Sequence, residues 1–215
     1  MRKTVFNTDE YYHIFNRGVD KRTIFQDRYD FGRFFQSVEE FNTIQPIGSI
    51  YEKSFQKDKP LGSLASKQKK LVELVCYCLN PNHYHFILKQ AAERGVEKFM
   101  HRLGTGYTKY FNIRHQRNGA LFQGSFKAKY IDSNEYLLYV SAYVNLNFKV
   151  HQLGSLASKS SWNEYTSKKS GLCSKNIILS QFRRPSEYEA FAKDALKVIR
   201  EHRGLADEIQ PMLIE

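Results

Sequence analysis

The sequence predicts an α+β domain in which the strands form one sheet and helices pack against it. Residues 71–90 read as two strands joined by a tight turn, which indicates an antiparallel hairpin. Residues 29–44 and 96–114 carry apolar side chains at helical spacing, and residues 121–131 end in a further strand. A chain of 215 residues is long enough for one such domain with a core of its own.

The hairpin is the centre of the prediction. Residues 71–79 are nearly continuously apolar, which is typical of a strand that is covered on both faces. Asn80-Pro81-Asn82 supplies a turn, and alternation after it places His83 and His85 on one face of the next strand. Two imidazoles held side by side by the backbone suit a metal ion. A solvated histidine pair on a polar strand face is the competing interpretation.

Cys76 and Cys78 offer a second interpretation of the same hairpin. They share a face of the first strand and lie across the turn from His83 and His85, so the four side chains could form a tetrahedral zinc site. Their spacing differs from the usual Cys-x-x-Cys knuckle, and they lie in the most apolar part of the run. Small buried hydrophobic residues are therefore the favoured interpretation of both cysteines.

Composition points towards a polyanionic partner. Lys and Arg exceed Asp and Glu by 33 to 22, which gives a formal charge of +11, and 14% of the residues are aromatic. Positive charge together with rings for stacking suits nucleic acid. Three cysteines, an odd number, indicate a reducing compartment, and no apolar run reaches the roughly 18 residues of a membrane span. We expect a cytoplasmic protein with no membrane contact.

The N-terminal part of the chain predicts a strand, a helix and a long loop. Residues 11–17 alternate before Gly18 and predict the strand, and the aromatic stripe of 29–44 predicts a helix packed on the core. Residues 45–70 are polar and rich in lysine, so we expect an inserted loop. The motif LGSLASK occurs in this loop at 61–67 and again at 153–159.

Downstream of the hairpin, the helix at 96–114 is weakened at Gly104 and Gly106, where a kink or a close backbone approach is expected. Its basic flank, 114–117, is a candidate phosphate-contacting rim. After the strand that ends at Ile131, Asp132 with Glu135 predicts the start of a helix spanning 136–147. Residues 151–175 read as a loop, and a closing helix is expected with four residues inward: Tyr188, Phe191, Ala195 and Val198.

Four segments together resemble the single-tyrosine HUH transposases, and most closely their REP-associated tyrosine transposase branch. The segments are HIFNRGVDKRTIF at 13–25, CLNPNHYHFIL at 78–88, YTKYFNIRHQRNGALFQGSFKAKYI at 107–131 and EYLLYVSAYVNLN at 135–147. The Pro-Asn-His-x-His motif is short and weakly specific by itself. Four segments in the family's order are a much stronger signal.

The resemblance implies a fold and a division of the chain. The family fold is a ferredoxin-like antiparallel sheet with helices packed on one face. Residues 1–150 would form the catalytic domain with 45–70 as an inserted loop, and residues 151–215 a C-terminal extension.

The resemblance also implies a site. The HUH histidines correspond to His83 and His85, which with Asn147 would bind Mg²⁺ or Mn²⁺, and the nucleophilic tyrosine corresponds to Tyr143. Tyr143 would attack single-stranded DNA beside a hairpin, forming a 5′-phosphotyrosine link and releasing a 3′-hydroxyl. Monomer and homodimer both remain open. Four basic residues are candidate contacts to the DNA backbone: Arg17, Arg102, Lys109 and Lys127.

Two positions depart from the family pattern. Ser125 stands where relatives often carry arginine after LFQG, which removes one DNA contact, and Phe148 stands where proline often follows Asn-Leu-Asn. Tyr107 and Tyr110 compete for the nucleophile's role, but both lie on the apolar stripe of their helix, where a phenol is structural.

Two other classes of function remain as alternatives. One is a module that binds folded DNA or RNA without cutting it, for which Tyr143→Phe would be silent. The other is a structural protein that holds zinc through Cys76, Cys78, His83 and His85, for which Cys76→Ser would release the metal.

Overall fold

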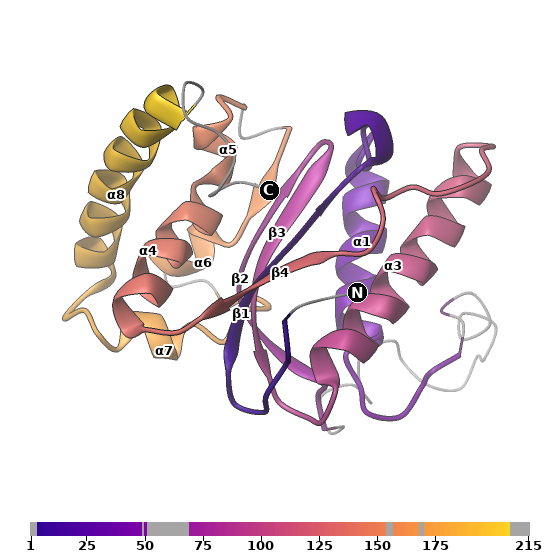
Figure 1. Ribbon diagram of the computed structural model, residues 1–215, viewed down its shortest axis with the longest axis horizontal. Helices are drawn as coiled ribbons and strands as arrows, with labels where there is room; N and C mark the ends of the chain where they lie inside the picture. Colours follow the sequence, from indigo (N-terminus) through magenta and orange to yellow (C-terminus); the bar gives the residue numbers. More distant parts are fainter. Residues whose placement is uncertain (1–3, 49, 51–68, 154–156, 168–169, 207–215) are drawn as a thin grey trace.

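The computed structural model describes residues 4–48, 50, 69–153, 157–167 and 170–206 (Figure 1). Its centre is an antiparallel sheet of five strands in the order β4-β1-β3-β2-β5. The strands are β1 (Tyr11–Arg17), β2 (Val72–Asn80), β3 (His83–Gln90), β4 (Lys127–Ile131) and β5 (Lys159–Ser160). The first four strands, with the helices between them, follow the ferredoxin-like order. The predicted α+β class with an antiparallel sheet is therefore confirmed.

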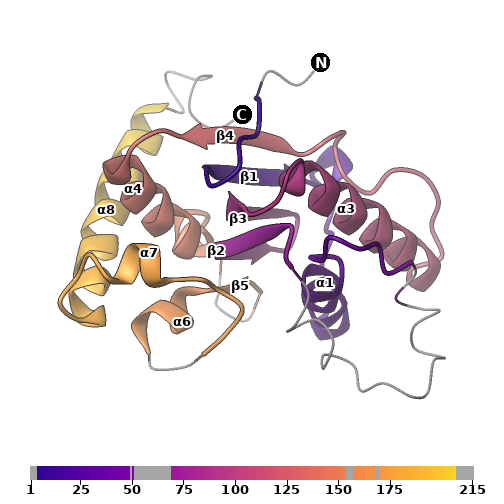
Figure 2. The same ribbon diagram turned by 90° about the horizontal axis from the view of Figure 1, so that it is seen from below.

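One face of the sheet is covered by α1 (Arg28–Glu40) and α3 (Gly95–Arg114), as Figure 2 shows. Their aromatic stripes pack against Tyr84, Phe86 and Leu88 of the hairpin in one core. In this core Phe34 lies between Tyr84 and Tyr107, at ring distances of 5.6 and 4.9 Å. α3 runs on through its glycines. A Cβ on Gly106 would lie 2.5 Å from the Phe41 ring, so this glycine allows the close approach, without a kink.

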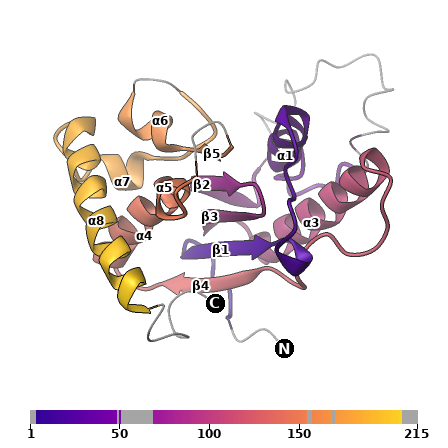
Figure 3. The same cartoon turned by 90° about the horizontal axis from the view of Figure 1, so that it is seen from above.

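The opposite face is also covered, which corrects the expectation of helices on one face only. The covering elements are α4 (Asn134–Asn145), α5 (Asn147–Val150), α6 (Trp162–Thr166), α7 (Asn176–Leu179) and α8 (Pro185–Ala206) (Figure 3). They bury Cys76, Cys78 and Ile87 in a second core. The physical reason lies in β2 and β3, which carry apolar side chains on both faces and need a layer on each.

Several local predictions need correction. Ser133, and not Asp132, caps α4 by accepting a hydrogen bond from the Tyr136 amide. α4 ends at Asn145, because Leu146 leaves helical geometry, and α5 begins at Asn147. On α8, Val198 is 43% exposed, and Leu196 and Ile199 are buried in its place. A short 3-10 helix, Val19–Lys21, follows β1.

The two polar segments that contain the LGSLASK motif are described only in part. The first LGSLASK copy, 61–67, and most of the expected loop 45–70 lie outside the described residues. In the second copy, Ser158 is buried and Lys159 begins β5, which pairs with Cys78 and Leu79 at the edge of the sheet. The sequence predicted a loop there, because two residues are too few for alternation to be recognised.

Candidate metal and nucleophile site

The alternation of β3 places its histidines on the face covered by α4 and α5. Tyr84, Phe86 and Leu88 belong to the core under α1 and α3, whereas Ile87 belongs to the opposite core. His83 and His85 share the face of Ile87, and their ring centroids lie 5.3 Å apart, as the sequence predicted.

Asn147 reaches His83 from the first turn of α5. Its side chain is fully buried, and its Oδ1 atom lies 3.1 Å from His83 Nε2. Asn80, opposite His83 on β2, donates from Nδ2 to Asn147 Oδ1 at 2.6 Å, and the same nitrogen lies 2.8 Å from His83 Nε2. Ser158, from the second LGSLASK copy, donates to Asn80 Oδ1 at 2.9 Å. The site is therefore built from both halves of the chain.

The spacing of His83 and Asn147 fits a divalent ion. Two ligand atoms in cis positions of an octahedral Mg²⁺ site lie about 3 Å apart, which matches the separation of His83 Nε2 and Asn147 Oδ1. Within the part of the chain that the structure describes, the buried Asn147 Nδ2 atom has no hydrogen-bond partner. The amide of Asn147 is thus held through its oxygen, the atom that a hard cation prefers.

Tyr143 lies next to the histidines, near the end of α4. Its half-buried ring meets His85 edge-on, with the centroids 5.5 Å apart and the planes at 87°. Because the helix breaks at Leu146, Tyr143 and Asn147 are not placed one turn apart on a continuous helix. Tyr143, His83, His85 and Asn147 nevertheless come together on one face of the sheet.

His13 completes this cluster, and the sequence reasoning did not assign it a role. Its Nε2 atom lies 2.9 Å from His85 Nδ1, and the two rings stack with centroids 5.2 Å apart. Burial, with a smaller effect of Lys129, lowers the pKa of His13 to about 3. Burial also holds the pKa of His85 well below its usual value, so both are neutral imidazoles, the form that binds metal. Alternation along β1 was a signal for His13, but its pairing with β3 was not visible.

Positive side chains line the same face. Arg17 lies opposite His83 in the β1–β3 register, and Lys127 and Lys129 lie opposite Phe15 and His13 in the β1–β4 register. Directly paired residues share a face, so these three exposed cations border the site. Arg17 and Lys127 were predicted from the sequence, and Lys129 was not.

The other two predicted DNA contacts lie elsewhere. Arg102 on α3 donates to the Thr43 carbonyl at 2.6 Å and so holds the end of the α1 segment. Lys109 is exposed on α3, on the far side of the sheet, where it borders a groove of 730 Å³ between α3 and residues 120–126. The structure does not bring either of them to the histidines.

The basic flank of α3 is engaged within the protein. Arg114 forms ion pairs with Asp27 at 2.7 Å and with the buried Asp30 at 3.1 Å, and His115 contacts Asp30 at 3.1 Å. Arg114 thus ties α3 to the start of α1, which corrects its interpretation as part of a phosphate-contacting rim.

The competing tyrosines are structural. Tyr107 is fully buried, donates to the Ile24 carbonyl at 2.6 Å, and has a pKa raised by burial. Tyr110 bonds Asp30. A phenol held in this way is a poor nucleophile, which leaves Tyr143 beside the histidines.

The zinc alternative finds no support in the geometry. Among the described residues, no group of three or more His, Cys, Asp or Glu side chains is arranged to hold a metal. Burial raises the pKa of Cys78 to about 12 and that of Cys76 well above its usual value, which opposes the thiolate that zinc requires. Both cysteines pack in the second core, as the favoured interpretation predicted.

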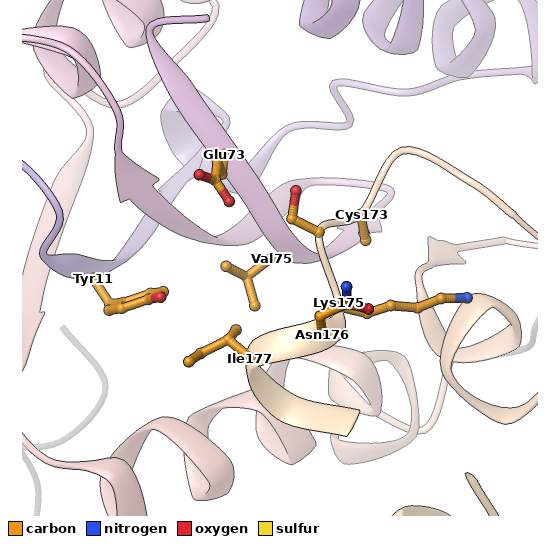
Figure 4. Close-up of a pocket in the computed structure, with 8 residues that line it drawn as sticks. Tyr11, Glu73, Val75, Cys173, Lys175, Asn176 and Ile177 are labelled. Carbon is orange, nitrogen blue, oxygen red and sulfur yellow. The ribbon is translucent and has the colours of Figure 1, made fainter. Parts of the chain in front are cut away.

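A separate hollow of 320 Å³ lies at the other end of the sheet face (Figure 4). Tyr11, Val75 and Ile177 gather around it, and the Lys175 side chain extends away to bond the Glu164 carbonyl. Among the described residues that line it, Glu73 is the one carboxylate, and it pairs with Lys89 at 4.0 Å. The hollow shares no residue with the histidine cluster.

In the described part of the chain, no helix has the length and apolarity needed to cross a membrane. No curated protein matches the chain. One similar solved structure is that of a REP-associated tyrosine transposase bound to a REP hairpin, with 10% identity, a TM-score of 0.49, and coverage of 72% of this chain and 76% of that chain. A family model described as "Transposase IS200 like" matches residues 62–147, the span that holds His83, His85, Tyr143 and Asn147. The resemblance to a transposase family that the sequence predicted is therefore confirmed over residues 62–147, where the chain is similar to the IS200-like transposases.

Proposed function

We propose that this protein is a metal-dependent nickase and strand transferase that acts on single-stranded DNA beside hairpins. The observation that carries the proposal is the gathering of Tyr143, His83, His85 and Asn147 at one place on the sheet. The family match over these residues supports a transposase, and the net charge of +11 supports a DNA substrate.

His83, His85 and Asn147 would hold Mg²⁺ or Mn²⁺, which supplies Lewis-acid polarisation of the scissile phosphate and a template for in-line attack. Burial lowers the pKa of His13 and of His85, so these two imidazoles add no positive charge to the site. Hard cations bind such a weak three-ligand set best when the phosphate shares the coordination.

Tyr143 is the nucleophile of the proposal. Its phenolic oxygen forms a bond to phosphorus and loses its proton, while the bond from phosphorus to the 3′-oxygen breaks and the leaving 3′-oxygen takes up a proton. The phosphodiester energy is kept in the 5′-phosphotyrosine link, so a 3′-hydroxyl can reverse the reaction and join a new strand. Contact between Tyr143 and His85 of the same chain supports action on its own metal site.

The DNA backbone would follow the positive border of the site. Arg17, Lys127 and Lys129 come from adjacent strands β1 and β4 and face the same side as the histidines. Exposed cations in a row position phosphates without reading sequence. They would hold the strand across Tyr143.

The test uses labelled single-stranded hairpin oligonucleotides, including hairpins found beside the gene, incubated with the protein and Mn²⁺ or Mg²⁺ and run on a denaturing gel. We expect a protein-sized labelled band that requires metal and is lost in Tyr143→Phe and in His83→Ala. Tyr139→Phe is the matched control, because Tyr139 lies one turn away on α4 and is 37% exposed.

A covalent band that persists in Tyr143→Phe would overturn the assignment of the nucleophile. A native-gel shift without any covalent band, equal in wild type and Tyr143→Phe, would replace the proposal with a module that binds folded nucleic acid.

A further inference from the structure

Both histidines of the proposed metal site have a hydrogen-bonding partner at Nδ1. His83 Nδ1 lies 2.6 Å from Asn82 Oδ1. The Asn82 amide is oriented by its own Nδ2, which donates to the Lys21 carbonyl at 3.3 Å. An amide oxygen only accepts hydrogen bonds, so His83 Nδ1 must carry the proton.

The other nitrogen of His83, Nε2, lies between a donor and an acceptor, since Asn147 Oδ1 is 3.1 Å away from it. Asn80 Nδ2, an amide donor, lies 2.8 Å from His83 Nε2. The Asn80 amide is oriented in turn, because its Oδ1 accepts from Ser158 Oγ at 2.9 Å. The Asn80 donor favours a lone pair on Nε2, whereas the Asn147 oxygen favours a proton there, so the shorter contact of Nδ1 with Asn82 Oδ1, at 2.6 Å, decides the tautomer. In that tautomer Nδ1 donates to Asn82 and Nε2 accepts from Asn80.

His85 meets a histidine at the corresponding position. Its Nδ1 atom lies 2.9 Å from His13 Nε2, in a buried contact between strands 72 residues apart in sequence. Two imidazole nitrogens at this distance share one proton, so one ring donates and the other accepts. If His85 donates, its Nε2 atom keeps the lone pair that a metal needs; if His13 donates, His85 Nε2 carries the proton and cannot bind metal.

We propose that Asn82 and His13 are positioning residues that hold His83 and His85 in the tautomer with the proton on Nδ1, so that both Nε2 lone pairs serve the metal. This inference rests on the metal set of the proposed function. Metal-binding histidines usually donate their second N–H to an oxygen acceptor. Here a neutral imidazole fills that place for His85.

In this proposal His83 and His85 are the ligands, and Asn82 and His13 position them. Asn82 sits in the turn between β2 and β3 and is covalently next to His83, so it acts through local geometry. His13 acts from β1, where Phe15, two residues on, stacks against His85 at 5.7 Å. The ring of His85 is thus fixed in orientation by packing and in tautomer by His13.

The first test reads the tautomers directly in the metal-free wild-type protein, by nitrogen-15 imidazole spectroscopy on selectively labelled histidine. We expect His83 and His85 to be protonated at Nδ1 and unprotonated at Nε2. A spectrum with the His85 proton on Nε2 would overturn the role of His13, and one with the His83 proton on Nε2 that of Asn82.

The second test measures Mn²⁺ affinity without DNA, by electron paramagnetic resonance of free Mn²⁺. His13→Phe and Asn82→Ala remove the acceptor, and we expect each to weaken binding about 10- to 100-fold. His13→Gln and Asn82→Asp restore an acceptor oxygen, and we expect them to bind within about threefold of wild type. The inference would be contradicted if His13→Phe bound Mn²⁺ as tightly as His13→Gln, and Asn82→Ala as tightly as Asn82→Asp.

A matched control is His101→Gln, since His101 is exposed on α3 on the other side of the sheet. It should leave Mn²⁺ affinity unchanged. The two proposals fail in different ways. If wild type forms no covalent band but its Mn²⁺ affinity still depends on His13, the nickase is rejected. If the band is normal but the Mn²⁺ affinity does not depend on His13 or Asn82, the positioning roles are rejected.

Discussion

At the scale of the residue, Asn147 is the buried polar residue that links the site's hydrogen bonds. It is fully buried, its oxygen is within reach of two site residues, and its Nδ2 has no hydrogen-bond partner within the described residues. A buried amide nitrogen without a partner costs about 1–3 kcal/mol. Such a residue is retained more readily for a ligand than for stability.

Asn147→Asp tests this balance. The carboxylate adds a charge to a buried position, so we expect a lower melting temperature than wild type in chelator. Mn²⁺ should then raise the melting temperature of Asn147→Asp more than that of wild type, because tighter binding to the folded state adds stability. Calorimetry with and without Mn²⁺ measures both shifts. No shift with Mn²⁺ in either protein would contradict metal binding at Asn147.

At the scale of the element, α4 carries Tyr143 and is held in place by α8. The Tyr188 hydroxyl accepts from Asn145 Nδ2 at 2.7 Å and lies 3.2 Å from Ser141 Oγ, in a fully buried contact. Ser161, before α6, donates to Asn145 Oδ1 at 2.6 Å. The C-terminal helices therefore fix the helix from which Tyr143 projects.

Tyr188→Phe should lower the free energy of unfolding by about 1–3 kcal/mol, because the Asn145 amide would lose its buried partner. Tyr139→Phe, at a more exposed position on α4, should change it by less than about 0.5 kcal/mol. Urea denaturation of the two variants measures the difference. Equal effects would mean that the buried hydrogen bond does not hold α4.

The junction of α1 and α3 predicts a pH dependence. Partial burial raises the pKa of Asp27, but hydrogen bonds from Arg114 and from the amides of Asp30 and Tyr29 outweigh it and hold the pKa below 3.8. A depressed folded pKa contributes stability above the ordinary value, and this stability is lost as pH falls through the folded pKa. The melting temperature should fall below about pH 4, and the fall should be smaller in Asp27→Asn. An identical fall in both proteins would assign the acid sensitivity to other groups.

At the scale of the whole molecule, one sheet carries a separate hydrophobic core on each of its faces. The core under α1 and α3 is dense in aromatic rings, and the core under α4 to α8 borders the histidine cluster. Strands β1 and β4 place three cations, Arg17, Lys127 and Lys129, on the face of the histidine cluster. Binding of single-stranded DNA should therefore depend strongly on salt.

The logarithm of the DNA affinity should fall linearly with the logarithm of salt concentration, with a slope of about −0.7 for each phosphate contacted. Arg17→Ala with Lys127→Ala should make the slope shallower by about 1.4, whereas Lys197→Ala, on the exposed side of α8, should not change it. Fluorescence anisotropy at several salt concentrations measures the slopes. An unchanged slope in the double variant would place the DNA elsewhere.

The sequence by itself determined the features that depend on neighbouring residues. Alternation put His83 and His85 on one face of a strand, helical spacing predicted α1, α3 and α8, and the family motifs pointed to Tyr143 and Asn147. Only the tertiary structure decided that helices cover both faces, that His13 meets His85 from 72 residues away, and that Ser158 supports Asn80. The physical reason is that periodicity shows which face a side chain takes, whereas strand register and packing between distant segments decide what that face meets.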